Sequence, residues 1–102
     1  MKFTTKLDTD LTVQSFAYMA NKLARSPGVQ YEQILSVAEN HRSALRLIQR
    51  DVIDLVQAEL AKQNVAVSDY QRIRKTIARK IDQAQQAITR IAAQYAPYAL
   101  AA

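Results

Sequence analysis

The chain has 102 residues and a formal net charge of +5, with no cysteine, one glycine and two prolines. Its length is typical of one domain and is sufficient to bury a core without metal ions or disulfides. The absence of cysteine excludes disulfides and thiolate metal sites, and the shortage of glycine and proline disfavours a sheet protein with many tight turns. We therefore expect residues 1–102 to form a single helical domain.

The sequence pattern carries no sign of a membrane span. No apolar run approaches the ~20 residues that a helix needs to cross a bilayer. Asp8 and Asp10 interrupt the N-terminal stretch before an apolar secretory signal could form. Two compartments stay open: the protein remains in the cytoplasm, or it is an envelope protein from which an export signal has been removed.

Both ends of the chain lack helical periodicity. Residues 1–9 are expected to form a polar arm, in which Phe3 and Leu7 are the side chains able to dock. Pro97 cannot continue a helical hydrogen-bond ladder, so it should end the last helix and leave 97–102 as a short tail.

The first helical pattern begins after the arm, with Asp10 or Thr12 as a plausible N-cap. Its apolar residues recur at helical spacing: Val13, Phe16, Ala17, Ala20, Leu23 and Ala24. Residues 26–28 read Ser-Pro-Gly, the strongest break in the chain. The pattern therefore predicts a short helix that ends near Arg25.

A much longer helix is predicted over residues 29–63. Its apolar seam alternates spacings of four and three: Ile34, Ala38, His41, Leu45, Ile48, Val52 and Leu55. The face is widened by Val37, Ala44, Val56 and Leu60. Residues 40–43 are its weakest part, and a break there is the alternative. Asn64 is the expected left-handed residue that follows the helix.

The third helix has the clearest pattern. Ser68 and Gln71 have the spacing of a capping box, which would open the helix at Ser68. The apolar residues that follow share one helical face: Tyr70, Ile73, Ile77, Ile81, Ala84, Ile88, Ile91 and Tyr95.

These helices predict an all-α fold: a long antiparallel hairpin plus a shorter N-terminal helix, as a three-helix or dimeric bundle. The first helix is about half as long as the second, so it should leave part of the hairpin's apolar face uncovered. We expect a second copy of the chain to cover that part in a homodimer, or another protein to bind there. The predicted interface residues are Leu45, Ile48, Val52, Ile81 and Ile88. If the second helix breaks near Asn40, a monomeric four-helix bundle is the alternative.

Residues able to do chemistry are scarce. His41 is the only histidine, it lies on the apolar seam, and no cysteine is available as a nucleophile. Carboxylate metal sites in bundles use Glu-x-x-His motifs, and no glutamate lies three residues before His41. We therefore interpret His41 as structural, and expect no enzyme activity, no catalytic residues, no cofactor and no metal site.

Two rows of basic residues are candidates for binding phosphate. Arg72, Lys75 and Arg79 share one face of the third helix, and Arg42, Arg46 and Arg50 form a second row at intervals of four. Lysine and arginine bind nucleic acid by displacing counterions from its phosphates. The alternative is a solvated surface, neutralised across the hairpin by acids of the second helix, namely Asp51, Asp54 and Glu59.

The segment from Leu60 to Ile73 includes Ser68-Asp69-Tyr70-Gln71-Arg72-Ile73. This Ser-x-Tyr-x-x-Ile helix start resembles that of a family of small, usually exported bacterial helical proteins, a domain family of unknown function. Asn64 stands where that family usually has glycine. The resemblance implies an all-helical envelope protein, transfers no catalytic residues and tilts against nucleic acid.

Taken together, the sequence favours a non-enzymatic interaction or structural module that acts through self-association or protein binding. The alternative is a basic accessory protein that binds nucleic-acid backbone without sequence specificity.

Overall fold

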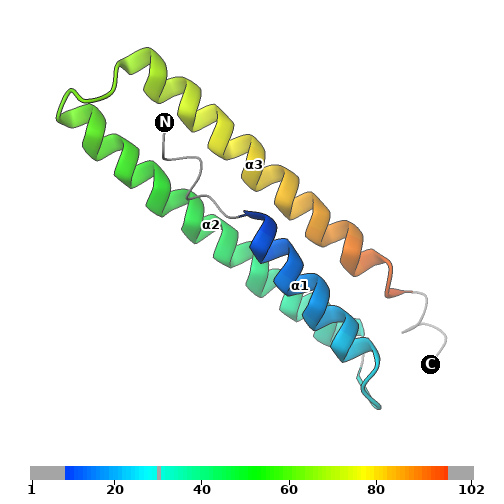
Figure 1. Cartoon of the computed structure of the whole chain (residues 1–102). Coiled ribbons are helices and arrows are strands. Elements are labelled where there is room, and N and C mark those ends of the chain that lie inside the picture. Colours follow the sequence, from blue (N-terminus) through cyan, green and yellow to red (C-terminus); the bar gives the residue numbers. More distant parts are fainter. Residues whose placement is uncertain (1–8, 30, 97–102) are drawn as a thin grey trace.

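The computed structural model describes residues 9–29 and 31–96, which form three helices and no strand. They are α1 (Thr9–Ala24), α2 (Tyr31–Ala61) and α3 (Val67–Ala93). Helices α2 and α3 form a long antiparallel hairpin, and α1 lies beside the half of it that is distant from the α2–α3 connection (Figure 1). The predicted all-α fold, a hairpin with a shorter N-terminal helix, is confirmed.

One hydrophobic core runs between the helices. Its largest fully buried side chains are Phe16 of α1, Leu45 and Val56 of α2, and Ile77 and Ile88 of α3. Burying side chains of this size contributes roughly 1.5–3 kcal/mol each. The other buried apolar residues of this core are Ala20, Ile34, Ala38, Val52, Val65, Ile73, Ile81, Ala84 and Ala92. The predicted stripe of α3 thus forms one side of the core.

Helix α2 is continuous through residues 40–43. The segment contains no glycine or proline, and Glu39 accepts hydrogen bonds from Arg42 and Arg46, which lie on the following turns. Because α2 does not break, the alternative of a monomeric four-helix bundle is wrong.

The turn after α2 is a Schellman motif whose left-handed residue is Gln63, with φ of 63°. The Asn64 N–H donates to the Glu59 carbonyl and the Gln63 N–H to the Leu60 carbonyl, each at 3.0 Å. The Asn64 side chain also donates to the Glu59 carboxylate at 2.7 Å. The prediction that Asn64 is the left-handed residue is therefore wrong by one position.

Helix α3 begins at Val67, with Ala66 as an N-cap whose side chain makes no capping bond. The Tyr70 N–H donates to the Ala66 carbonyl at 2.9 Å. Since Ser68 and Gln71 both lie inside the helix, they cannot close a capping box around its start, and that prediction is wrong.

Helix α1 begins earlier than predicted, because Thr9 is already helical and buried. Asp10 and Thr12 lie inside the helix, so neither is its N-cap. The end of α1 at Ala24 agrees with the prediction, and Gly28 supplies a positive φ of 79° to the turn that follows. The predictions for residues 1–8 (Phe3 and Leu7 included) and for 97–102 lie outside the described residues.

Candidate interaction surfaces

The predicted interface residues lie mainly inside the chain's own core. Leu45 and Ile88 are fully buried, Val52 and Ile81 are buried, and Ile48 is half-buried against the core. For the four buried residues the sequence prediction needs correction, because their side chains contact neighbouring helices of the same chain and are not free to contact a second copy. The periodicity located an apolar face correctly, but it could not show which helix covers that face.

Helix α2 does expose some apolar side chains, at different positions. Leu47 and Leu55 are each 51% exposed, whereas Ile48, next to Leu47 in the sequence, is half-buried. Leu55 was assigned to the buried seam, so its exposure corrects the predicted helix face. Single exposed leucines are common on protein surfaces.

The arginine row of α2 is largely neutralised by nearby acids. The Glu39 carboxylate accepts hydrogen bonds from Arg46 Nη2 at 2.8 Å and from Arg42 Nε at 3.1 Å. The hydrogen bond from Arg46 has the larger effect and that from Arg42 the smaller, and together they hold the pKa of Glu39 below its usual value. Arg42 also donates to Thr89 Oγ1 on α3 at 3.3 Å, and Arg50 lies 3.6 Å from the Asp51 carboxylate. Each arginine of this row therefore has a carboxylate within 4 Å that competes with an external anion.

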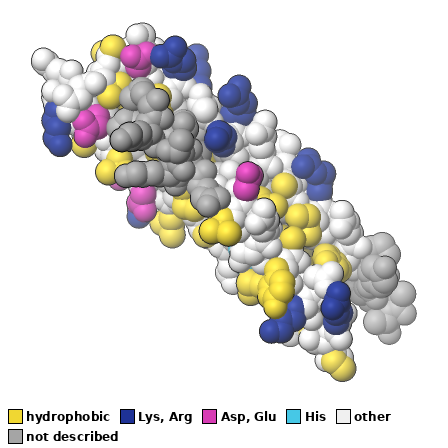
Figure 2. Space-filling view, viewed as in Figure 1, with side chains coloured by type: hydrophobic (Ala, Val, Ile, Leu, Met, Phe, Trp, Pro, Cys, Tyr) yellow, Lys and Arg dark blue, Asp and Glu magenta, His cyan; other side chains and the backbone are white. Residues whose placement is uncertain are grey.

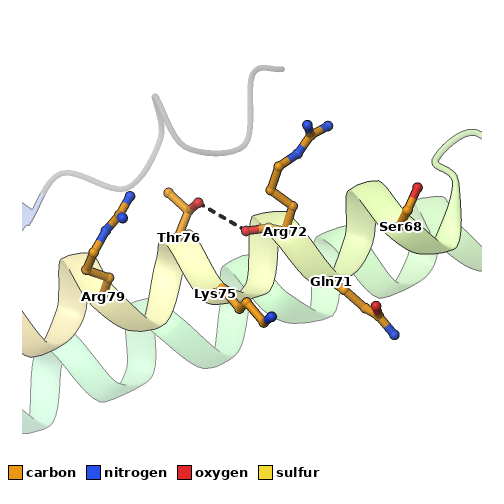
Figure 3. A pocket seen from close by; sticks show the side chains of 6 residues that line it. All are labelled: Ser68, Gln71, Arg72, Lys75, Thr76 and Arg79. Carbon is orange, nitrogen blue, oxygen red and sulfur yellow. Dashed lines mark hydrogen bonds between the residues drawn. The ribbon is translucent and has the colours of Figure 1, made fainter.

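The arginines and lysine of α3 are arranged differently. Arg72, Lys75 and Arg79 are all exposed, and they border a shallow surface hollow together with Ser68, Gln71 and Thr76 (Figure 3). We call these six residues the basic face. The Thr76 hydroxyl donates to the Arg72 carbonyl at 3.0 Å, which turns it back toward the helix and leaves the longer cationic side chains projecting.

No acid of α2 neutralises the basic face by an ion pair among the described residues. None of the ion pairs there joins α2 to α3: Glu39 pairs with Arg42 and Arg46, Asp51 with Arg50, Glu59 with Lys62 in the turn just after α2, and Asp69 with Arg72. Within 9–29 and 31–96, Lys75 and Arg79 have no ion-pair partner. Cross-hairpin neutralisation, the expected alternative, is therefore not found. Figure 2 shows lysine and arginine side chains spaced along the edge of the molecule that α3 forms.

His41 joins α1 to α2. Its Nδ1–H donates to the Val37 carbonyl at 2.8 Å, since a carbonyl can only accept. Its Nε2 lies 3.2 Å from Ser15 Oγ of α1, and its ring is 5.5 Å from that of Phe16. Nδ1 is thus used within α2, whereas Nε2 and the ring contact link α2 to α1, which agrees with the structural interpretation.

Two further properties concern the described part of the chain. It contains no group of three or more histidine, aspartate or glutamate residues that could hold a metal ion. None of its helices is both long enough and apolar enough to cross a membrane.

Comparison with protein-family models, with curated proteins and with solved structures finds no match. The resemblance carried by residues 68–73 therefore stays a prediction.

Proposed function

We propose that the chain is a non-enzymatic interaction module that binds an anionic partner through the basic face of α3. The observation that carries the proposal is the local imbalance of charge on this helix. Arg72, Arg74, Lys75, Arg79 and Lys80 lie within nine consecutive residues, and Arg72 alone has an acidic partner, Asp69, within the described part of the chain.

The structure gives less support to self-association, and more to anion binding, than the sequence does. Self-association was favoured because the hairpin's apolar face needed a cover, and most of the residues named for that role are buried within the chain. Anion binding is less favoured from the sequence because acids of α2 are expected to neutralise α3. In the structure Asp51 pairs instead with Arg50 of α2, and Glu59 pairs with Lys62 in the turn that follows α2. Both physical reasons for preferring self-association are therefore weaker.

The chemistry of such a surface is electrostatic. Exposed lysine and arginine side chains form charge-assisted hydrogen bonds to phosphate or carboxylate oxygens. Serine, glutamine and threonine beside them, as at Ser68, Gln71 and Thr76, can add neutral contacts. Because the surface is open to solvent, salt will screen the attraction strongly, and we expect affinity only for a partner with many negative charges.

A polyanion of simple chemistry tests the proposal. We expect inorganic polyphosphate to bind the protein at low salt in isothermal titration calorimetry, and to bind less tightly as salt is added. The variant Lys75→Gln/Arg79→Gln removes the two cations of the basic face that lack ion-pair partners, so its affinity should fall at least tenfold. Circular dichroism should show an unchanged fold, because both side chains are exposed. Equal affinity of the variant and the wild type would contradict the proposal.

A second candidate function is self-association through Leu47 and Leu55, which the exposure of these two side chains favours. The family resemblance also supports it, since it tilts against nucleic acid. If these leucines form an interface, the folded protein should sediment as a dimer, and Leu47→Asp/Leu55→Asp should sediment as a monomer with its helix content retained. A wild-type protein that remains monomeric at high concentration would exclude this candidate.

A further inference from the structure

The arrangement of cations around the basic face suggests the shape of the partner. Arg74 directly precedes Lys75, and Lys80 directly follows Arg79. Successive residues of a helix are about 100° apart, so Arg74 and Lys80 lie on opposite flanks of the row formed by Arg72, Lys75 and Arg79. Cations therefore occur both along the outermost line of α3 and on its two sides.

We propose that the partner is a DNA duplex, and that α3 lies along the mouth of its major groove, where the long side chains of the row and of the flanking cations reach the phosphates on either side. This inference rests on the proposed function, which requires only a polyanion. A helix with its side chains is about 10–12 Å across, which matches a major groove about 12 Å wide in B-DNA. Along the row, the seven residue steps from Arg72 to Arg79 extend about 10 Å.

The apolar and aromatic residues of α3 argue against the other large polyanions. A membrane-surface helix inserts its apolar face into the lipid boundary, but Ile73, Ile77 and Ile81 are buried in the core. Single-stranded nucleic acid is bound by stacking bases on exposed aromatic rings. Tyr70 is half-buried, and its hydroxyl accepts a hydrogen bond from Gln57 Nε2 at 3.1 Å, so it lies away from the basic face and toward α2.

The contacts available are of the kind that position a protein on a duplex without reading its sequence. Lysine, arginine, serine, threonine and glutamine side chains all donate to phosphate oxygens. We therefore expect affinity to vary little with base sequence and strongly with salt. Four cations without an ion-pair partner in the described residues (Arg74, Lys75, Arg79 and Lys80) predict that log K falls with log salt at a slope of about −3.6.

The test measures fluorescence anisotropy of a labelled 20-base-pair DNA duplex between 50 and 200 mM salt. Over this range the slope above corresponds to a loss of about a hundredfold in affinity. In the variant Lys75→Gln/Arg79→Gln the slope should become shallower by about 1.8, because two counterions fewer are released. The flank variant Arg74→Gln/Lys80→Gln should show a similar change.

The matched control is Arg42→Gln/Arg46→Gln, which removes the same charge from arginines already bound to Glu39. Its slope should stay close to that of the wild type, and an equal loss in this control would contradict the assignment to α3. Single-stranded DNA of the same length and vesicles of anionic phospholipid complete the comparison. Binding to polyphosphate or vesicles without binding to the duplex would overturn this inference and leave the proposed function standing. Failure to bind any of these polyanions would overturn both.

Discussion

At Glu39, one carboxylate accepts hydrogen bonds from two arginines on the next turns of α2. This arrangement explains why two basic rows that look equivalent in the sequence differ in the structure. The α2 row has an acid within reach of Arg42 and Arg46, whereas Lys75 and Arg79 on α3 have none in the described part of the chain. The availability of a cation to a partner depends on such contacts as much as on its spacing.

The pKa of Glu39 gives a test of this arrangement. Its pKa is lowered mainly by the hydrogen bond from Arg46, so the carboxylate stabilises the folded state above the ordinary pKa of glutamate. That stabilisation is lost as pH falls through the depressed folded value. We expect Arg46→Gln to raise the pKa of Glu39 toward its ordinary value, as measured by carbon-detected NMR titration. The same titration midpoint in both proteins would show that Arg46 does not hold the carboxylate.

Leu45 and Leu47 are a second informative pair, because they are two residues apart and differ completely in exposure. We expect Leu45→Ala to lower the free energy of unfolding by about 2–5 kcal/mol, since it leaves a cavity in the core. Leu47→Ala should change it by no more than about 0.5 kcal/mol. Urea denaturation measures both values. Similar losses at the two positions would contradict the assignment of Leu45 to the core and Leu47 to the surface.

At the scale of the helices, the turn between α2 and α3 carries a testable strain. Gln63 adopts a positive φ, which costs a non-glycine residue about 1–2 kcal/mol. Gln63→Gly removes this strain but adds backbone freedom to the unfolded chain, so we expect a net gain of about 0.5–1 kcal/mol. Thermal denaturation should show Tm raised by roughly 2–6 °C.

The control for this turn is Gln83→Gly, in the exposed middle of α3. There glycine should lower the free energy of unfolding by about 0.5–1 kcal/mol, because the helical φ is negative and gives glycine no advantage. A lower Tm in both variants would indicate that Gln63 is not strained.

The helices also show what could be predicted from the sequence. The stripe of α3 was predictable because its apolar residues follow helical spacing without interruption, and α2 was predictable because no glycine or proline interrupts it. The helix ends were less predictable. Ala66 caps α3 without a side-chain bond, and Gln63 rather than Asn64 takes the left-handed conformation, so neither end follows the usual residue preferences.

The candidate site was predictable only in part, for a physical reason. The shared face of Arg72, Lys75 and Arg79 follows from their spacing, and all three are exposed. Whether acids of α2 reach them depends on how side chains of two helices are oriented across the hairpin, and spacing within one helix does not contain this information. The same limit explains why Leu45 and Ile88 were assigned to an interface between chains, although they are buried within one.

As a whole, the molecule is a rod of 57 × 17 × 15 Å, with a radius of gyration of 17.0 Å. A compact protein of this length would have a radius of gyration of about 13 Å. The elongated shape follows from the hairpin, which sets the length, and from α1, which covers only part of it (Figure 1). A straight outer face of α3 is thereby presented to a partner, with its basic residues concentrated toward the α2–α3 connection.

NMR chemical-shift mapping would show whether polyanions bind at the basic face of α3 or at another surface of the molecule. Nitrogen-15-labelled protein would be titrated with a short DNA duplex and, separately, with polyphosphate. We predict the largest shift changes at residues 68–80, with small changes at residues 39–50. Changes centred on the Arg42–Arg50 row or on Leu47 and Leu55, or no changes with either polyanion, would show that α3 does not bind polyanions through its basic face.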